Sequence, residues 1–290
     1  MMEVEDMPGK IMSKNELDEL ARRIRIKIVK MIGKSGTGHL GGSMSIVEIL
    51  TVLYFNEMNY DEKNPDWEDR DRLVLSKGHA CPALDAVLSE KGVIPEEALW
   101  TLHKPDSILQ MHPDMRICKG IEMSTGSLGQ GLSAAIGMAL GAKMRGKNFR
   151  VYAIIGDGEC NEGQIWEAAM SASKYKLDNL VAILDYNKLA LSEKLANVMP
   201  VEPFYDKWTS FGWHVISTDG HSVAELINAF NQATKVKDKP VMIIANTVKA
   251  KGVSFYEDRW QCHAVTITPE EVEKALRELN CPEDEIIDTL

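Results

Sequence analysis

The order of hydrophobic and polar residues along the chain predicts alternating helices and strands. Ser13 and Glu16 have the spacing of a capping box, and apolar residues then recur at intervals of three and four, which predicts a helix ending near residues 33–38. A second helix is expected at residues 45–56. Short apolar runs of strand length follow at residues 72–76, 151–155, 180–185, 214–217 and 241–246. This alternation predicts an α/β fold with a mainly parallel sheet that is covered by helices on both faces.

The composition fits one large domain. The chain has 290 residues, of which 44% are hydrophobic, so a sizeable core is available. Neither a repeat nor a long linker divides the sequence. We therefore expect a single domain over residues 1–290, with a last helix at 269–279 and peripheral tails at about 1–12 and 281–290.

Charge and hydropathy argue against several classes of protein. The formal net charge is -10 and no run of Lys and Arg occurs, so nucleic acid is not an expected partner. No signal-like leader and no apolar stretch of about 18 residues is present, which predicts a soluble cytoplasmic protein without membrane contact. The five cysteines lie far apart and never form C-x-x-C, so we expect reduced thiols.

Candidate chemistry is concentrated where two neighbouring strands should end. Gly156, Asp157 and Gly158 follow one strand, and Asn187 follows the next, with a helix at residues 164–175 between them. The carboxyl ends of parallel strands meet at one edge of a sheet, so Asp157 and Asn187 should emerge together. Glycines permit close backbone approach, and carboxylate and amide oxygens suit Mg²⁺ with phosphate. Gly-Asp-Gly alone also fits an ordinary turn, and the glycine patterns of dinucleotide and P-loop sites are absent.

Several further segments sharpen this interpretation. The chain contains GHLGGSMSIVEIL (38–50), DRLVLSKGHACPAL (71–84), MHPD (111–114), STGSLGQGLSAAIGMA (124–139) and GDGECNEGQIWEA (156–168). Together these segments resemble the transketolase family, in its order, over about residues 15–255. The resemblance implies a thiamine diphosphate-binding fold that uses thiamine diphosphate and Mg²⁺ to transfer a two-carbon ketol unit between sugar phosphates, by default in pentose phosphate metabolism.

The resemblance also implies a partner. The matched segments all belong to the diphosphate domain of the family, so the chain resembles the N-terminal subunit of a split transketolase. The pyrimidine-binding domain, with the glutamate that activates the cofactor, is then expected on a C-terminal transketolase subunit. Self-association through the small-residue helix at residues 133–142, a two-plus-two assembly and no activity of the isolated chain are expected as well.

Residue roles follow from the matched motifs. The expected magnesium ligands are Asp157, Asn187 and the main-chain carbonyl of Leu189. The residues expected beside the cofactor are Lys77, His79, Gly126, Leu128, Gly156, Asp157, Gly158, Asn187, Leu189 and Lys249. The residues expected to serve catalysis, through proton relay or a shared proton with a partner carboxyl, are His39, His79, His112, His263 and Glu162. His103, His214 and His221 match no family position and are expected to be structural.

One segment departs from the family pattern. In N-terminal subunits of the family a histidine commonly follows closely on an aromatic residue after a KGKG-like segment. Here Gln261 follows Trp260, and His263 lies two places further on. The register of this segment is therefore open, as is the range of sugars, although His263 is expected to reach the diphosphate or the donor hydroxyls.

Other functions compete with a sugar-phosphate transketolase. A specialised sugar is compatible with every motif, and a non-catalytic partner subunit of the same fold is a different class, disfavoured by the histidines. A 1-deoxyxylulose-phosphate synthase is normally one long chain, and the α subunit of a 2-oxo-acid dehydrogenase is not expected to contain SKGHA. A nicotinamide-dependent Rossmann enzyme lacks its glycine fingerprint here.

Overall fold

A five-stranded parallel sheet forms the centre of the protein. The computed structural model describes residues 12–289, and its strands lie in the order β2-β3-β4-β6-β5, each parallel to its neighbours. Their bounds are Arg72–Leu75 (β2), Val151–Gly156 (β3), Leu180–Tyr186 (β4), His214–Asp219 (β5) and Val241–Asn246 (β6). All five lie where the hydrophobic runs predicted strands, so the α/β prediction is confirmed.

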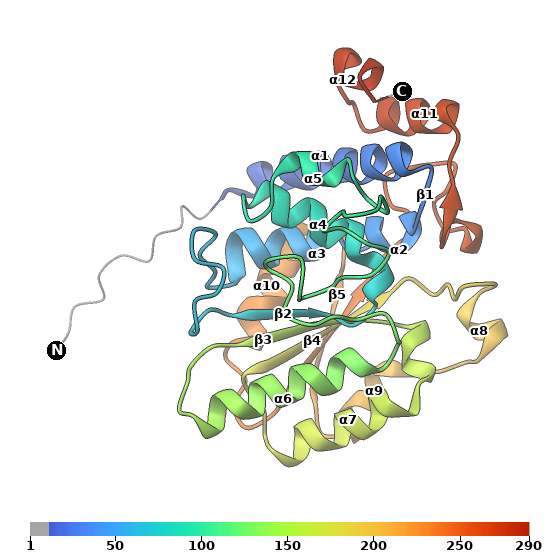
Figure 1. Ribbon diagram of the computed structural model, residues 1–290. Coiled ribbons are helices and arrows are strands. Elements are labelled where there is room, and N and C mark those ends of the chain that lie inside the picture. Colours follow the sequence, from blue (N-terminus) through green and yellow to red (C-terminus); the bar gives the residue numbers. More distant parts are fainter. Residues whose placement is uncertain (1–11, 290) are drawn as a thin grey trace.

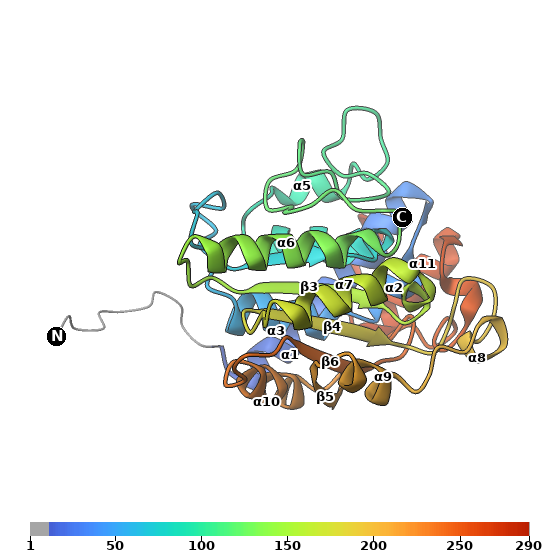
Figure 2. The ribbon, with the colours of Figure 1, turned by 90° about the horizontal axis from the view of Figure 1, so that it is seen from below.

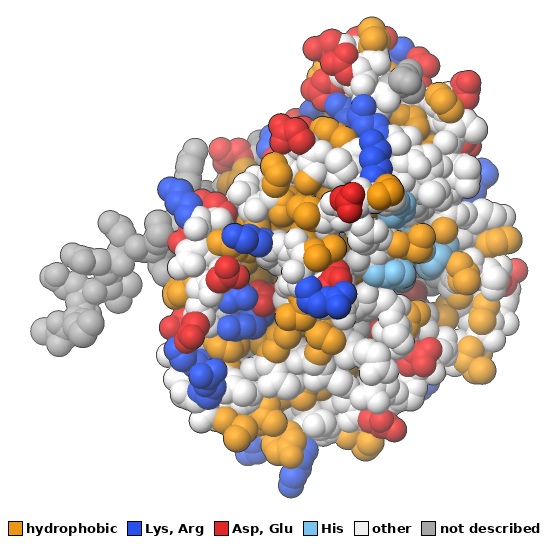
Figure 3. Space-filling view, viewed as in Figure 1, with side chains coloured by type: hydrophobic (Ala, Val, Ile, Leu, Met, Phe, Trp, Pro, Cys, Tyr) orange, Lys and Arg blue, Asp and Glu red, His pale blue; other side chains and the backbone are white. Residues whose placement is uncertain are grey.

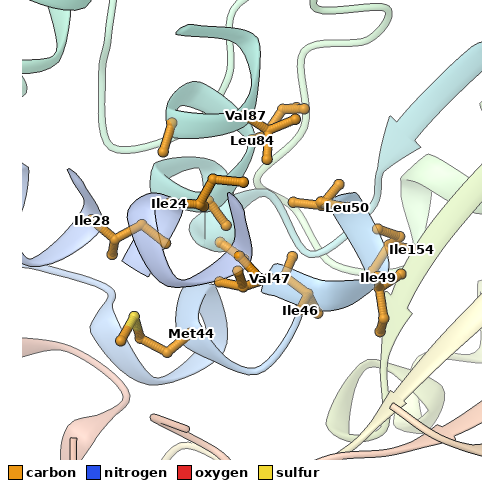
Figure 4. Close-up of a cluster of buried hydrophobic side chains, with 14 of the residues drawn as sticks. Ile24, Ile28, Met44, Ile46, Val47, Ile49, Leu50, Leu84, Val87 and Ile154 are labelled. Carbon is orange, nitrogen blue, oxygen red and sulfur yellow. The ribbon is translucent and has the colours of Figure 1, made fainter. Parts of the chain in front are cut away.

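Helices cover both faces of this sheet (Figures 1 and 2). One layer contains α1 (Lys14–Ser35), α3 (Val47–Val52), α4 (Cys81–Glu90) and α10 (Val223–Ala233). The other contains α6 (Gln130–Met144), α7 (Gly163–Lys174) and α9 (Phe204–Ser210). Successive residues of a strand point to opposite faces, so Ile154 packs into the cluster under the first layer and Ile155 into the second. Figure 4 shows Ile154 beside Ile49 and other aliphatic side chains of the first layer.

The first two helices form close to where the sequence predicts them. The Ser13 hydroxyl and the Glu16 carboxylate complete a capping box on α1. The helix expected at 45–56 forms as α3 and continues directly into one π-helical turn, η1 (Leu53–Glu57), while a short α2 (Leu40–Met44) precedes it and is separated from it by a turn at Ser45. The turn allows the Ser45 hydroxyl to reach the buried Asp185 carboxylate at 2.8 Å.

Smaller elements complete the chain. A two-stranded antiparallel ribbon pairs β1 (Thr37–Gly38) with β7 (Val265–Thr266), a contact between distant segments that local pattern does not predict. The remaining elements are α5 (Glu96–Leu99), α8 (Leu195–Val198), α11 (Pro269–Glu278), α12 (Glu283–Ile287) and the 3₁₀ turns η2 (Gly78–Ala80), η3 (Gly158–Asn161) and η4 (Trp260–Cys262). The expected C-terminal tail thus contains α12, in which Ile286 is buried; the N-terminal tail lies largely outside the described residues. None of the helices described here is both long and apolar enough to cross a membrane.

A buried charged triad joins the first helical layer to the loop after β6. Arg25 on α1 forms two hydrogen bonds with the Glu48 carboxylate on α3, at 2.6 and 2.8 Å. His221 Nδ1 lies 3.0 Å from Glu48 Oε2, and its Nε2 accepts the Val248 N–H at 2.8 Å. Because the backbone N–H is a donor, Nε2 carries no proton, and Nδ1 donates to Glu48. This arrangement fixes the imidazole and holds the loop that carries Lys249.

Glu48→Gln is expected to lower the free energy of unfolding at pH 7 by about 3–5 kcal/mol, because Arg25 would remain buried without its counter-charge. Burial alone would raise the pKa of Glu48, but the Arg25 charge and the His221 hydrogen bond outweigh burial and lower it from 4.5 to about 2. A lowered folded-state pKa stabilises the fold above pH 4.5, and this contribution disappears as the pH falls towards 2.

Urea unfolding of both proteins between pH 3 and pH 7 measures the difference. Glu283→Gln is the matched control, because Glu283 forms an exposed pair with Arg277, and such pairs contribute little. Equal stabilities of the Glu48 variant and the unchanged protein at pH 7 would refute the role given to the triad.

Candidate active site

Loops that follow the strands bring the expected residues to one edge of the sheet. Lys77 and His79 follow β2, Asp157 follows β3, Asn187 follows β4 and Lys249 follows β6. In open parallel sheets this is the edge at which ligands bind. The close-packed strands therefore place side chains that are far apart in sequence around one site.

The predicted magnesium ligands lie together in the structure. The Asp157 carboxylate accepts the N–H groups of Gly158 at 2.7 Å and Lys188 at 2.5 Å. The Asn187 side-chain oxygen accepts the Leu189 N–H at 3.1 Å. Each of these oxygens uses one lone pair in the contact and keeps another for a cation. No group of three or more His, Cys, Asp or Glu side chains in residues 12–289 is arranged as metal ligands, so the site offers one carboxylate with amide and main-chain oxygens.

The buried carboxylate of Asp157 shows whether the site is suited to a cation. The side chain is 2% exposed, and no basic side chain of the described chain forms an ion pair with it. Burial raises the pKa of Asp157 to about 7, and the nearby Asp185 carboxylate adds to the rise. A buried carboxylate without a direct ion-pair partner is costly even though the Lys249 charge lies nearby, and a divalent cation bound to oxygens would lower that cost. The donor set therefore fits Mg²⁺ with phosphate oxygens.

Asp185 forms a buried ion pair beneath this edge. Its Oδ2 lies 2.6 Å from the Lys77 ammonium, and both side chains are almost fully buried. Burial alone would raise the pKa of Asp185, but the Lys77 charge and the hydrogen bonds to Asp185 lower it. The positive charge of Lys77 is thus already neutralised within the protein, and the predicted contact of Lys77 with a cofactor remains a prediction.

Four histidines converge beside these loops. The ring centroid of His39 lies 5.4 Å from that of His79, 6.2 Å from that of His112 and 5.5 Å from that of His263, and the rings of His79 and His263 are 4.8 Å apart. In Figure 3 the histidine side chains lie on the side of the molecule where Figure 1 shows α8, bordered by hydrophobic side chains. The fold therefore brings His263, whose register was open, into the same cluster.

Burial keeps these imidazoles neutral. Burial lowers the pKa of His112, and it lowers that of His39 with a smaller contribution from the neighbouring His112. Burial with the nearby Lys77 charge lowers the pKa of His79 to about 2, and burial with the Lys249 charge lowers that of His263 to about 3. Neutral imidazole has one donor and one acceptor nitrogen, so the cluster can both give and accept protons.

Lys249 connects the histidine cluster to the predicted metal ligands. Its ammonium donates to the carbonyls of Leu189 at 3.2 Å and Ala190 at 3.1 Å, and it lies 3.2 Å from His263 Nδ1. Burial lowers the pKa of Lys249. The Leu189 carbonyl that the sequence motif assigns to the metal therefore faces a positively charged group here.

Glycines shape the loop before α6. A Cβ on Gly126 would lie 3.1 Å from the His112 ring, so the backbone approaches that histidine closely. Gly129 has φ +86, and a Cβ there would lie 2.8 Å from the Cβ of Glu162. Leu128 is partly buried between these glycines, and Glu162 is exposed at the start of α7. The structure leaves the roles predicted for Leu128 and Glu162 as predictions.

Sequence reasoning missed two buried acids of the site. Asp185 is one, and Glu159 is the other: its carboxylate accepts the Ser76 hydroxyl at 2.5 Å and the backbone N–H groups of Gly129 and Gly156 at 2.8 and 2.9 Å. A signal was present for Asp185, because a charged residue near the end of an otherwise apolar central strand must find partners. Glu159 has no comparable signal, since it lies in a turn where exposed acids are common.

The fold and the sheet-edge site define a thiamine diphosphate-binding α/β domain. The family model described as "Transketolase, thiamine diphosphate binding domain" matches residues 17–285. The chain belongs to the transketolase family.

Similar proteins include both separate subunits and longer chains. The chain is 50% identical to the 6-deoxy-6-sulfo-D-fructose transketolase subunit SqwG of a Clostridium species, over 91% of this chain and 96% of that one. It is 41% identical to one of the subunits of the apulose-4-phosphate transketolase of Phocaeicola vulgatus, over 91% of this chain and 94% of that one. Human transketolase is 42% identical over 91% of this chain and 42% of its own length. The crystal structure of Campylobacter jejuni transketolase superposes with a TM-score of 0.88 at 30% identity, over 96% of this chain and 46% of that one.

Asp157→Ala is expected to abolish Mg²⁺-dependent binding of thiamine diphosphate while the free energy of unfolding changes by at most about 2 kcal/mol, because relief of the unpaired charge offsets two lost hydrogen bonds. Titration of thiamine diphosphate, followed by tryptophan fluorescence with and without Mg²⁺, measures binding. Asp219→Ala is the control, since Asp219 also ends a strand of this sheet and accepts a backbone N–H. Unaltered binding by the Asp157 variant would remove the metal assignment.

Proposed function

We propose that this chain is the diphosphate-binding N-terminal subunit of a two-chain transketolase, which transfers a two-carbon ketol unit from a ketose phosphate to an aldose phosphate. The observation that carries the proposal is the cluster of His39, His79, His112 and His263 beside an oxygen site suited to Mg²⁺. A protein that only bound a partner would have no use for such a cluster.

The cofactor and its metal belong at the sheet edge. Asp157 and the side-chain oxygen of Asn187 would hold Mg²⁺, with the Leu189 carbonyl as a third ligand. Gly156 and Gly158 would let the diphosphate approach the backbone, and Lys249 would face its negative charge. Gly126 and Leu128 would border the cofactor's rings. Bound thiamine diphosphate supplies the electron sink for breaking and forming the carbon–carbon bond next to a carbonyl.

The histidines would handle protons on the sugars. A ketol transfer needs a proton removed from one hydroxyl and supplied to a carbonyl oxygen, and a neutral imidazole has one acceptor and one donor nitrogen for these two tasks. The close spacing of His39, His79 and His263 allows them to contact adjacent oxygens of one sugar chain. His112 lies further out, on a loop that also exposes Met111 and Met115.

A C-terminal subunit with the pyrimidine-binding domain is the proposed partner. The two loops that contain His112 and Leu189 expose apolar side chains: Met111, Met115, Ile117, Leu191, Val198 and Met199. Exposed apolar groups of this density are typical of interaction surfaces. The chain spans less than half of the single-chain transketolases that it resembles, and a partner with the pyrimidine-binding domain would cover these loops.

Self-association through α6 is a second part of the proposed assembly. Gly137 and Gly141 have open space above their Cα atoms, and Met144 near the end of the same helix is 80% exposed. A two-plus-two assembly would bury this surface, and Glu162, exposed at the start of the neighbouring α7, would meet a carboxyl group of the partner. The five free cysteines are all buried and fit a reducing compartment such as the cytoplasm.

A specialised sugar is the second candidate substrate. The relative at 50% identity is named for 6-deoxy-6-sulfo-D-fructose, and another at 41% for apulose 4-phosphate. A sulfonate and a phosphate share the tetrahedral anionic end that a transketolase donor carries. The two candidate substrates would therefore be distinguished by the side chains that bind this anionic end. We place those side chains on the partner chain.

His112→Ala is expected to lower kcat of the two-chain enzyme by about 10²–10⁴-fold, with much less effect on the affinity for thiamine diphosphate, since its proposed contact is to the sugar. Steady-state kinetics at saturating donor, together with a cofactor titration, separates the two effects. His214→Ala is the control, because His214 is exposed at the start of β5, on the opposite edge of the sheet. A kcat equal to that of the unchanged enzyme would exclude His112 from proton transfer.

The isolated chain is expected to show no ketol transfer with thiamine diphosphate and Mg²⁺, because the carboxyl group that activates the cofactor would lie on the partner. Co-expression with the C-terminal subunit should restore turnover. The assay uses ribose 5-phosphate as acceptor and compares xylulose 5-phosphate, fructose 6-phosphate and 6-deoxy-6-sulfo-D-fructose as donors. Turnover by the isolated chain would contradict the division of the site, and the preferred donor would decide between the two candidate substrate classes.

A further inference from the structure

Asp185 occupies an unusual position for a charged residue. It lies near the end of the central strand β4 and is 0% exposed. Besides Lys77, three side chains donate to it: Ser45 at 2.8 Å and Asn187 at 2.9 Å to Oδ2, and Thr247 at 2.5 Å to Oδ1. These donors come from four separate segments of the chain, so one carboxylate fixes how those segments meet.

The contact with Asn187 has a chemical consequence. The two ends of a carboxamide differ, because the oxygen can bind a cation and the NH₂ group cannot. The terminal torsion of asparagine has no strong intrinsic preference between the two orientations. Asp185 accepts the NH₂ end at 2.9 Å, while the oxygen accepts the Leu189 N–H at 3.1 Å. Because Asp185 can only accept and the Leu189 N–H can only donate, a single orientation of the Asn187 amide satisfies both hydrogen bonds.

We propose that Asp185 is a positioning residue for the metal: it orients the Asn187 amide so that its oxygen is available to a divalent cation. The proposal rests on the proposed function, since it concerns the cation that holds the diphosphate. It assigns Asp185 no contact with metal, cofactor or sugar. The Lys77 ammonium, 2.6 Å away, makes this possible by compensating a charge that the interior would otherwise not tolerate.

Asp185→Asn tests the proposal in the co-expressed two-chain protein. The Mg²⁺ concentration that gives half-maximal binding of thiamine diphosphate is measured by fluorescence titration, and Tm is measured without cofactor. Loss of a group that orients a metal ligand typically weakens metal affinity by about 10–100-fold. Asp185→Asn is therefore expected to raise the Mg²⁺ concentration at half-maximal binding by the same factor. Thr247→Val is the matched control: it removes a hydrogen bond from the other carboxylate oxygen and leaves the Asn187 contact. It should lower Tm with at most about a threefold change in the Mg²⁺ requirement.

A double variant that exchanges the residues at positions 185 and 187 distinguishes loss of amide orientation from misfolding. In Asp185→Asn with Asn187→Asp, the amide at 185 can donate to the carboxylate at 187, so the hydrogen bond returns with reversed polarity and the ligand oxygen is retained. The exchange should recover at least about tenfold of the lost Mg²⁺ affinity. The proposal is overturned if Asp185→Asn and Thr247→Val shift the Mg²⁺ requirement equally, or if the exchange recovers nothing. Absence of Mg²⁺-dependent binding in the unchanged protein would instead refute the proposed function.

Discussion

The buried ion pair between Lys77 and Asp185 is the contact on which the rest of the site depends. It joins the loop after β2 to the end of β4, and the Lys77 ammonium also donates to the Gly42 carbonyl at 2.7 Å. Neither charge would be stable in the interior without the other. Because the pair compensates itself, Asp185 can accept further hydrogen bonds, whereas Asp157 has no direct ion-pair partner among the described residues.

Two environments therefore lie side by side at the ends of the strands. Around Asp157 the protein has excess negative charge in a buried position, which suits a divalent cation. The histidine rings, in contrast, are neutral, because burial and the charges of Lys77 and Lys249 oppose their protonation. In the proposed function, the first region would hold a metal and a diphosphate, and the second would exchange protons with a sugar.

The same edge of the sheet also exposes apolar side chains. Its loops expose methionine, leucine and valine side chains, whereas most apolar side chains of the two helical layers are buried in two cores. Family relatives exist both as separate subunits and as halves of longer chains. A stable domain whose reactive edge is apolar and open is what a division of one active site between two polypeptides requires.

The sequence by itself determined the five strands, the capped first helix and the positions of Asp157 and Asn187, because these depend on local periodicity and on the rule that parallel strands end at one edge. Motifs also identified His39, His79 and His112. Only the tertiary structure decided that His263 joins them, that β1 pairs with β7 and that Ser45, Lys77, Asn187 and Thr247 share one carboxylate. Most of these contacts join residues far apart in the chain, and their energies depend on burial, which no local pattern of residues specifies.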